Sequence, residues 1–416
     1  MSNASQNLEK KSSFPSSYQP SVEILEKYAD VLVNFALNSG AGVKPGEVVD
    51  CAIPDVAKPL ALALQNALLK AGAQPMVRLL PTGFDKDYFN LANQKQLEFF
   101  PKKYLQSRAT LFDHQIGIIA EPYPQELKDV DHSKIILARD SKKQYRDWLN
   151  AKENAGKFTW TIGLWGVEAK AQEVGLSLEA YWQQIIQACF LDEANPAAHW
   201  TKIAKEQEQI RQALNDMKIQ WVHAVGADMD VKLKIGSERT WNGGSGRNIP
   251  SFEIFTSPDW RGTEGWIKFN QPLYRYGNIV EGIRLEFQKG LVTQASATRG
   301  ESLLKTMLKS HNADKLGEYS LTDRRFSRIT HPMAETLFDE NIGGPFGNSH
   351  VAIGMSYQDC YRSDPTKVTK AGWKKMGYND ASEHTDLVST TDRTVTATLA
   401  NGVEKIIYAK GEFQVC

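Results

Sequence analysis

The stretch VVDCAIPDVAKPLALALQNALLKAGAQPMVRLL, residues 48–80, predicts the fold of the N-terminal half of this 416-residue chain. It opens with a short apolar run at 48–53, which follows a Pro-Gly pair. An Ala- and Leu-rich helix is expected at 56–70, before Gly72, and a second strand at 75–80. Short buried strands that alternate with helices indicate a mostly parallel sheet with helices on both faces.

The same alternation continues along the first half of the chain. Apolar residues at the helical spacing predict an amphipathic helix at 22–37. No phosphate-binding loop follows the strands, because Gly244 and Gly246 are not followed by the third glycine of a dinucleotide-binding fingerprint. This half is therefore predicted to be a scaffold that shapes a cleft or a dimer surface. Further elements are expected as a helix at 85–99, strands at 116–120 and 158–164, and a charged helix at 201–217.

After the charged helix the pattern changes to short strands separated by tight turns, such as Asn401-Gly402. We expect a disordered tail at 1–20, an N-terminal α/β domain at 21–225 and a strand-rich α+β C-terminal domain at 226–416. Strands in this second domain are expected at 231–235, 266–270, 282–287, 291–297, 317–321, 351–355, 394–399 and 403–409, with a short helix at 301–309.

The composition limits the partners and the compartment of the protein. Lys and Arg number 49, as do Asp and Glu, so the formal net charge is zero. This balance argues against nucleic acid or an anionic membrane as the main partner. The first nineteen residues hold no apolar run that fits a signal peptide, and no window approaches the roughly 20 apolar residues of a membrane span. The four cysteines are far apart, so we expect reduced thiols in a cytoplasmic protein.

Four segments of the second half carry side chains that suit metal binding. Glu253 lies in an apolar segment after a glycine-rich loop, and Glu318 lies in a predicted strand. His384 and Asp386 are two residues apart, so on a strand both point to the same side. Each alone has an ordinary structural interpretation, as a surface carboxylate or a hydrogen-bonded pair. The fourth segment, LFDENIGGPFGNSHVAIGMSY at 337–357, contributes Glu340, His350 and Tyr357.

Together these segments supply three Glu, two His and one Asp, an oxygen-rich set that suits two divalent ions. Several carboxylates are needed, because two cations close together require several negative ligands. From such a set we expect two divalent metal ions, zinc or cobalt first and manganese next.

The order of the segments resembles the M29 family of metallo-aminopeptidases. RNIPSFEIFTSP at 247–258 is similar to the first glutamate segment of that family, and LGEYSLTD at 316–323 to the second. The segment at 337–357 resembles its Asp-Glu-Asn and histidine segment, with a longer loop between Glu340 and His350. The segment HTDL at 384–387 is similar to its His-x-Asp segment.

The resemblance implies an aminopeptidase that releases N-terminal residues from short peptides with a free amino terminus. It also implies a homodimer whose active sites face an enclosed cavity. Tyr357 would be a catalytic hydrogen-bond donor, and Glu253 or Glu318 would act as the catalytic base. Metal ligation is implied for Glu253, Glu318, Glu340, His350, His384 and Asp386.

Two other readings remain open at this point. Another dinuclear hydrolase, an amidase or a phosphoesterase, would keep the metal ligands but should show a basic clamp, for which Arg247, Arg275 and Arg299 are candidates. A non-catalytic peptide-binding relative would keep the fold without needing all six ligands.

Overall fold

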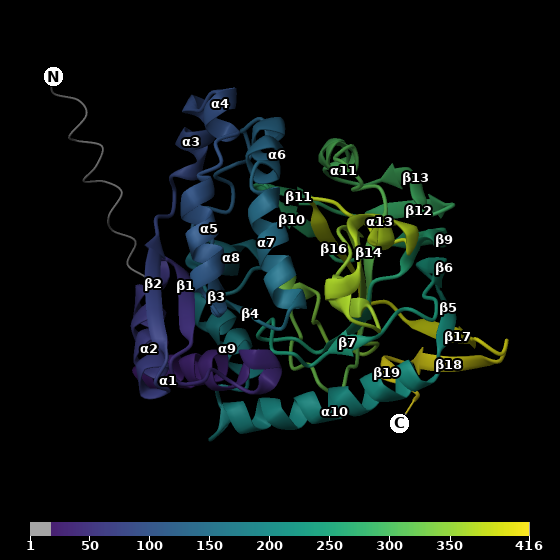
Figure 1. The fold of residues 1–416 in the computed structure, drawn as a ribbon, viewed down its shortest axis with the longest axis horizontal. Coiled ribbons are helices and arrows are strands. Elements are labelled where there is room, and N and C mark those ends of the chain that lie inside the picture. The colour runs from purple at the N-terminus through teal and green to yellow at the C-terminus, as the bar shows by residue number, and fades with distance from the viewer. Residues whose placement is uncertain (1–17, 416) are drawn as a thin grey trace.

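The computed structural model describes residues 18–415, so most of the predicted tail at 1–20 lies outside the described residues. Figure 1 shows two halves side by side, with helices and a small sheet in the first and mostly strands in the second. The predicted fold class, an α/β half followed by a strand-rich α+β half, is confirmed.

The first half is built on a four-stranded parallel sheet in the order β2-β1-β3-β4. The stretch quoted above forms two of its strands and the helix between them, as predicted. Strand β2 is an edge of this sheet, and strand β4 is the other edge. The strands are β1 (Val48–Pro54), β2 (Gln74–Leu80), β3 (His114–Ile119) and β4 (Thr159–Leu164).

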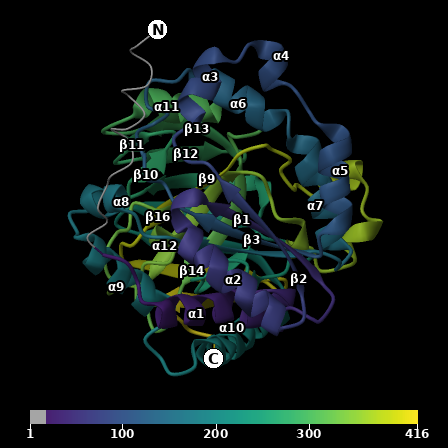
Figure 2. The ribbon, with the colours of Figure 1, turned by 90° about the vertical axis from the view of Figure 1, so that its left-hand side faces the viewer.

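Helices cover both faces of this sheet. On β1, Val49 and Cys51 enter the main core of the first half, whereas Asp50 between them pairs with Arg108 at 2.6 Å. Because successive side chains of a strand point to opposite faces, α5, which carries Arg108, lies on the face opposite that core. Figure 2 shows α1 and α2 in front of the strands. The helices of the core side are α1 (Val22–Asp30), α2 (Lys58–Lys70) and α9 (Leu178–Ala188), and α5 (Lys102–Leu111) lies opposite.

Two predicted helices have different ends from those expected. The helix expected at 22–37 leaves the α conformation after α1, in a π-helical turn at Val31–Phe35. The helix expected at 85–99 is two short helices, α3 (Asp85–Leu91) and α4 (Gln94–Leu97). The break has a local cause, because the side chain of Asn93 caps the start of α4.

The second half contains an eight-stranded sheet, a five-stranded sheet and a two-stranded hairpin. Strand β5 pairs along its length with β6 and β17, so the eight-stranded sheet begins a few residues before the expected division after residue 225. The division into two domains stays a prediction. The large sheet consists of β5 (Ile219–Gly226), β6 (Met229–Lys234), β9 (Asp259–Lys268), β12 (Arg284–Gln288), β13 (Leu291–Ser296), β17 (Arg393–Leu399), β18 (Glu404–Ala409) and β19 (Glu412–Phe413).

The five-stranded sheet lies nearer the first half and runs in the order β16-β15-β14-β8-β7. Helix α11 (Glu301–Leu308) matches the helix expected at 301–309. The strands of this sheet are β7 (Asn242–Gly243), β8 (Glu253–Thr256), β14 (Leu316–Thr322), β15 (Asn348–Gly354) and β16 (His384–Ser389), and the hairpin is β10 (Leu273–Arg275) with β11 (Asn278–Val280). The other helices are α6 (His132–Asp140), α7 (Lys143–Asn154), α8 (Glu168–Glu173), α12 (Thr336–Asp339) and α13 (Lys370–Lys375).

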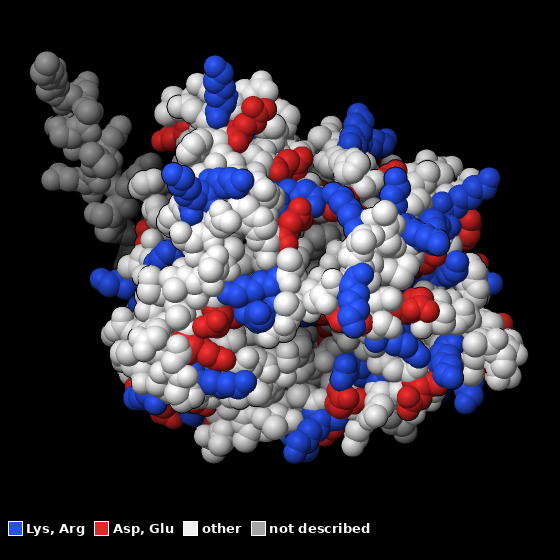
Figure 3. All heavy atoms as spheres, in the orientation of Figure 1, with Lys and Arg blue, Asp and Glu red and all other residues white. Residues whose placement is uncertain are grey.

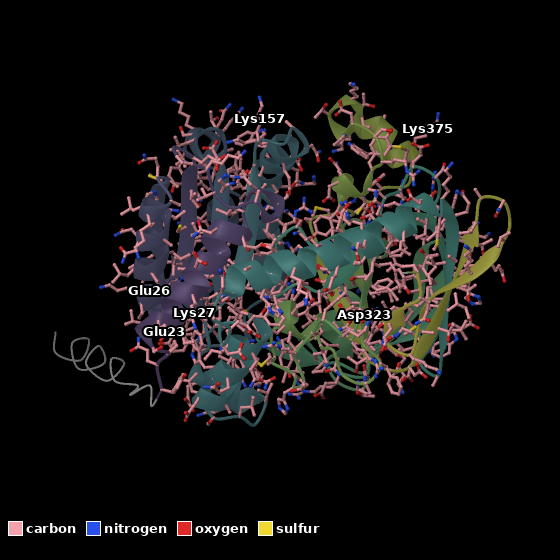
Figure 4. The ribbon with its side chains drawn as sticks, turned by 90° about the horizontal axis from the view of Figure 1, so that it is seen from below. Glu23, Glu26, Lys27, Lys157, Asp323 and Lys375 are labelled. Carbon is pink, nitrogen blue, oxygen red and sulfur yellow. The ribbon has the colours of Figure 1, made fainter. Side chains whose placement is uncertain are left out.

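Helix α10 (Pro196–Asp216) ties the two halves together. Trp200 and Ile203, near its start, belong to the core of the first half. Ile210 and Leu214, near its end, belong to the core of the second half. Figure 4 shows this helix crossing the molecule from one half to the other. One rigid element therefore contributes to both cores and fixes their relative position.

Among residues 18–415, no helix is both long and apolar enough to cross a bilayer. Cys51, Cys189 and Cys360 are buried and unpaired within the same range. Cys416 lies outside the described residues.

Candidate metal centre

Four neighbouring strands of the five-stranded sheet carry five of the six predicted ligands. Glu253 begins β8, Glu318 lies on β14 and His350 on β15, while His384 and Asp386 lie on β16. The His-x-Asp pair thus lies on a strand, the case in which both side chains point to the same side.

The register of the sheet places these five residues on one face. Ser320 is opposite His350, and Ala352 is opposite both Glu318 and Asp386. Side chains at alternate positions share a face, so the residues i and i+2 of each strand line up with their cross-strand partners. The small side chains of Ser320 and Ala352 leave space between the charged ones.

Glu340 reaches the same face from outside the sheet, directly after the short helix α12. It is buried, and Asn248 Nδ2 donates a hydrogen bond to its Oε1 at 3.3 Å. Its neighbour Asp339 has a different task, because its carboxylate accepts the backbone N–H groups of Met333 and Glu335. Burial raises the pKa of Asp339 to about 7. Of the adjacent acidic residues Asp339 and Glu340, only Glu340 faces the cluster.

Short distances join the side chains of the cluster. His350 Nε2 lies 3.3 Å from Glu253 Oε2 and 3.6 Å from Glu318 Oε1. His384 Nε2 lies 3.0 Å from Glu318 Oε2 and 3.4 Å from Asp386 Oδ1. Glu318 therefore turns one carboxylate oxygen to each imidazole and occupies the centre of the cluster.

Hydrogen bonds outside the cluster orient its members. His384 Nδ1 donates to the backbone oxygen of Met355 at 2.9 Å, which leaves Nε2 free to bind a cation. Glu253 accepts the hydroxyl groups of Ser251 at 3.2 Å and Ser320 at 3.4 Å. His350 Nδ1 is buried without a hydrogen-bond partner within residues 18–415.

The electrostatics of the cluster call for added positive charge. Burial, together with Asp386 and Glu253, raises the pKa of Glu340 well above its usual range. Although burial alone lowers the pKa of an imidazole, Glu253 and Glu318 raise the pKa of His350 well above its usual value. Within residues 18–415 the ion pairs of Glu253, Glu318 and Asp386 are with the two histidines, and Glu340 forms no ion pair. Four carboxylates gathered in a largely buried site with no Lys or Arg partner are costly unless cations neutralise them.

The donor set fits divalent cations. The cluster contains three groups of three ligand atoms, and the atoms of each group lie within 4.8 Å of one another. Each pair of groups shares a residue. Imidazole nitrogen and carboxylate oxygen are the ligands of zinc and of related divalent metals. The groups are Glu253 with Glu318 and His350, Glu318 with His384 and Asp386, and Glu340 with His350 and Asp386.

Tyr357 lies beside the cluster, as the sequence predicted. Its ring is 4.7 Å from the ring of His384, and its backbone N–H donates to Ser257 Oγ at 2.8 Å. Burial, with Glu318 and Asp386, raises the pKa of Tyr357 well above its usual value. The phenol therefore keeps its proton at neutral pH and is available as a hydrogen-bond donor.

Sequence reasoning did not place Trp160 or Glu153 at this site. Strand β4 of the first half forms a single bridge to the loop that precedes β8 in the second half. There the backbone N–H of Ile162 donates to the carbonyl of Arg247 at 2.9 Å. This pairing brings Trp160 into the lining of the cavity over the cluster, which measures ≈ 60 Å³. No local motif signals these residues, because the contact forms between distant parts of the chain.

Two larger cavities adjoin the small cavity over the cluster, and Trp160 and Tyr357 line all three of them. One measures ≈ 1000 Å³ and runs between α7 and the segment 355–380. The other measures ≈ 680 Å³ and lies at the carboxyl ends of β1, β2 and β3. Ligands of open α/β sheets often bind at such strand ends. The cluster is thus reached by two spaces between the halves.

The arginines considered for a phosphate clamp are engaged elsewhere. Arg247 pairs with Glu153 at 2.8 Å and with Asp359. Arg275 pairs with the buried Glu383 at 3.0 Å. Arg299 is more than half exposed and lies outside the linings of the three cavities. A phosphoesterase would need a free cationic clamp at the cluster, so this arrangement counts against that reading.

A buried face of carboxylates and imidazoles, reached by cavities between two halves, defines a metal-dependent hydrolase site. The family described as thermophilic metalloprotease (M29) matches residues 21–413. The chain belongs to this M29 family, as its motifs predicted, and it is a peptide-bond hydrolase whose family implies divalent metal ions.

Similar proteins cover nearly the whole chain. Aminopeptidase PepS of Streptococcus thermophilus is 25% identical over 396 residues, which are 88% of this chain and 92% of PepS. Aminopeptidase T of Thermus thermophilus is 25% identical over 415 residues, 94% of this chain and 98% of that protein. The solved structure of wild-type AmpT from Thermus thermophilus superposes with a TM-score of 0.80 at 23% identity, covering 94% of this chain and 99% of AmpT. The last comparison supports the fold class.

Proposed function

We propose that the protein is an aminopeptidase that removes N-terminal residues from short peptides at a two-metal centre. The observation that carries the proposal is the shared face of the five-stranded sheet, where three overlapping ligand groups lie in one cavity. Several relatives are named aminopeptidases, which supports the choice of reaction. Zinc or cobalt, and then manganese, suit the donor set of imidazoles and carboxylates.

The six side chains Glu253, Glu318, Glu340, His350, His384 and Asp386 would hold the metal ions. Bound divalent cations activate water and polarise a peptide carbonyl. The chain supplies the remaining chemistry. The free amine of a substrate's N-terminus would be a further ligand for a metal ion held there, and this need for a free amine favours an exopeptidase over an endopeptidase.

Proton transfer falls to the carboxylates of Glu253 or Glu318. Both lie on the face that the substrate must reach, and both have an oxygen within 4 Å of His350 Nε2. Either carboxylate accepts the proton of the attacking water and returns it to the leaving amine. Tyr357 donates its hydroxyl proton in a hydrogen bond to the negative oxygen that develops at the attacked carbonyl.

Metal removal and substrate blocking test this function together. A chelator should abolish hydrolysis of aminoacyl p-nitroanilides, and added zinc or cobalt should restore it. Peptides with an acetylated amino terminus should resist cleavage, whereas the same peptides with a free amine should be cleaved. Full activity after removal of all metal, shown by elemental analysis, would contradict the proposal, and so would equal cleavage of blocked and free peptides.

We also propose that the enzyme acts as a homodimer in the cytoplasm. Strand β2 is an edge of its sheet, and apolar side chains of the first half are exposed, such as Leu91 at 83% and Phe99 at 68%. A second copy of the chain would cover such surface. Sedimentation velocity measures the assembly, and a mass of one chain at micromolar concentration would contradict the dimer.

A further inference from the structure

The two larger cavities that adjoin the small cavity over the cluster differ in charge. The cavity at the carboxyl ends of β1 to β3, here the acidic cavity, is lined by seven acidic residues and two Lys or Arg residues. The cavity between α7 and the segment 355–380, here the lysine-lined cavity, is lined by five Lys or Arg residues and four acidic ones. The cations of the latter are Lys143, Arg247, Lys315, Lys370 and Lys374.

A short peptide has opposite charges at its two ends. In the proposed reaction its amino end lies at the metal centre, so its carboxylate extends into one of the two cavities. In the acidic cavity the carboxylate would meet Glu121, Glu173 and Glu335, and like charges at close range repel. The lysine-lined cavity offers the complementary charge. Figure 3 shows Lys and Arg side chains on both sides of the hollow between the two halves.

Most cations of the lysine-lined cavity are already paired. Lys143 contacts Asp147 at 2.8 Å and Asp380 at 2.9 Å. Lys370 contacts Asp380 at 3.3 Å. Arg247 and Lys315 likewise have acidic partners. Lys374, on α13, is exposed and forms no ion pair within residues 18–415, so its charge remains free for a ligand.

The walls of this cavity also suit the rest of a peptide. Trp160 and Tyr357 line its inner end, beside the cluster, and Trp260, Trp373 and Tyr378 line it as well. Aromatic walls bind apolar side chains and leave hydrogen-bonding groups at their edges. A volume of ≈ 1000 Å³ lies at the upper end of the range for small-ligand pockets, which is roughly 300 to 1,000 Å³.

We propose that the lysine-lined cavity binds the part of the peptide that follows the scissile bond, and that Lys374 recognises the free carboxylate at its C-terminus. The inference rests on the proposed aminopeptidase function and names its substrate class: short peptides with both termini free. The acidic cavity remains for the side chain of the first residue.

A pair of lysines on one helix provides a matched test. Lys374 lines the cavity, whereas the next residue, Lys375, is also exposed on α13 but does not line it. Lys374→Glu should lower kcat/KM for the tripeptide Leu-Gly-Phe about three- to tenfold, mainly through KM, as expected for one exposed charge reversal. It should leave the amidated tripeptide unchanged. Lys375→Glu should change neither substrate.

A binding measurement without turnover separates this inference from the proposed function. Acetyl-Gly-Phe, whose amine is blocked, should bind the metal-loaded wild-type protein more tightly than its amide, as measured by calorimetry. The difference should vanish in Lys374→Glu and shrink in 1 M salt, where the Debye length is about 3 Å.

The outcomes are distinct. An equal loss of kcat/KM for the tripeptide and its amide in Lys374→Glu would overturn the role of Lys374. So would a wild-type protein that binds acetyl-Gly-Phe no more tightly than its amide. Hydrolysis of both tripeptides would still uphold the aminopeptidase. If the metal-loaded wild type cleaves neither peptide, the proposed function fails, and the calorimetric comparison still decides whether the cavity recognises a carboxylate.

Discussion

Tyr357 is the side chain on which substrate, cluster and both larger cavities converge. It lines all three cavities and packs against His384 on one side and Phe255 on the other. A phenylalanine ring would fill the same space, so the hydroxyl is not needed for packing. The residue is therefore suited to a direct test of chemistry at fixed structure.

Tyr357→Phe should lower kcat by about 10²-fold, the loss typical of one missing oxyanion donor, because the developing negative oxygen then lacks a partner. KM should change little, since the ground-state carbonyl needs this bond less. Steady-state kinetics on an aminoacyl p-nitroanilide measures both values.

Tyr361→Phe is the matched control. Tyr361 packs edge-on against Trp373 and lies outside the cavity linings. It should keep wild-type kcat. An unchanged kcat in Tyr357→Phe would remove this hydroxyl from the mechanism.

At the scale of single residues, the structure brings together the side chains that the sequence motifs singled out, while their roles stay predictions. All six predicted ligands and Tyr357 line one cavity. The sequence did not reveal that Trp160 lines this cavity or that Arg247 pairs with Glu153 and Asp359, because these contacts join strands and loops distant in the chain. It also gave no sign that Asp339 would serve the backbone rather than the cluster.

The sheet face is the element that creates the centre. Ala352 is fully buried and lies opposite both Glu318 and Asp386. On this face of the sheet its side chain is only a methyl group. Its neighbour Val351 points into the core of the second half instead. The alternation of this strand thus separates the apolar core from the charged face.

Ala352→Leu should abolish metal binding, because three added carbon atoms would enter the space between the ligands. Elemental analysis should show less metal per chain than in the wild type, and activity should fall in proportion. Overpacking of a buried site also costs about 1–3 kcal/mol of stability.

Ala352→Ser separates the two effects, since its hydroxyl is small enough to keep the space. It should retain metal and most activity. Normal metal content in a folded Ala352→Leu protein, shown by circular dichroism, would mean that the face has more free space than the register indicates.

The positions of helices and strands were predictable where the hydrophobic periodicity is strong. The residues at which they begin and end were less predictable. The strand at 48–53 and the helix after it appear almost as expected. The helix expected at 85–99 is interrupted at Asn93, because the cap formed by the Asn93 side chain competes with a continuous helix. Hydrophobic spacing does not reveal such a cap. The order of the strands, which brings Glu253 beside Glu318, depends on long-range pairing and was not predictable from any local pattern.

At the scale of the whole molecule, the site depends on how the two halves meet. Arg247, on the loop before β8, pairs with Glu153 at the end of α7 and with Asp359 beyond Tyr357. Burial raises the pKa of Glu153 even though Arg247 opposes the shift. The bridge therefore joins a buried carboxylate of the first half to the loop that precedes β8.

Arg247→Met should loosen this junction, and the effect should depend on pH. A carboxyl group whose pKa is raised on folding stabilises the folded state below its unfolded pKa, and that gain is lost as pH rises through the folded pKa. Without Arg247 the pKa of Glu153 rises further, so the loss extends towards neutral pH. The fall in Tm should be larger at pH 8 than at pH 5. At pH 8 the free energy of unfolding should fall by about 1–3 kcal/mol, as for a partly exposed pair.

Two companions make the test specific to this bridge. Glu153→Gln in the Arg247→Met background removes the buried charge, so it should recover part of the lost Tm at pH 8 and little at pH 5. Arg328→Met breaks an exposed contact between the halves, with Asp192 and Glu193, and should change Tm only slightly at either pH because exposed ion pairs contribute little. A pH-independent fall in Arg247→Met, or no recovery in the double variant, would show that Arg247 acts through packing against Trp160 rather than through the charge of Glu153.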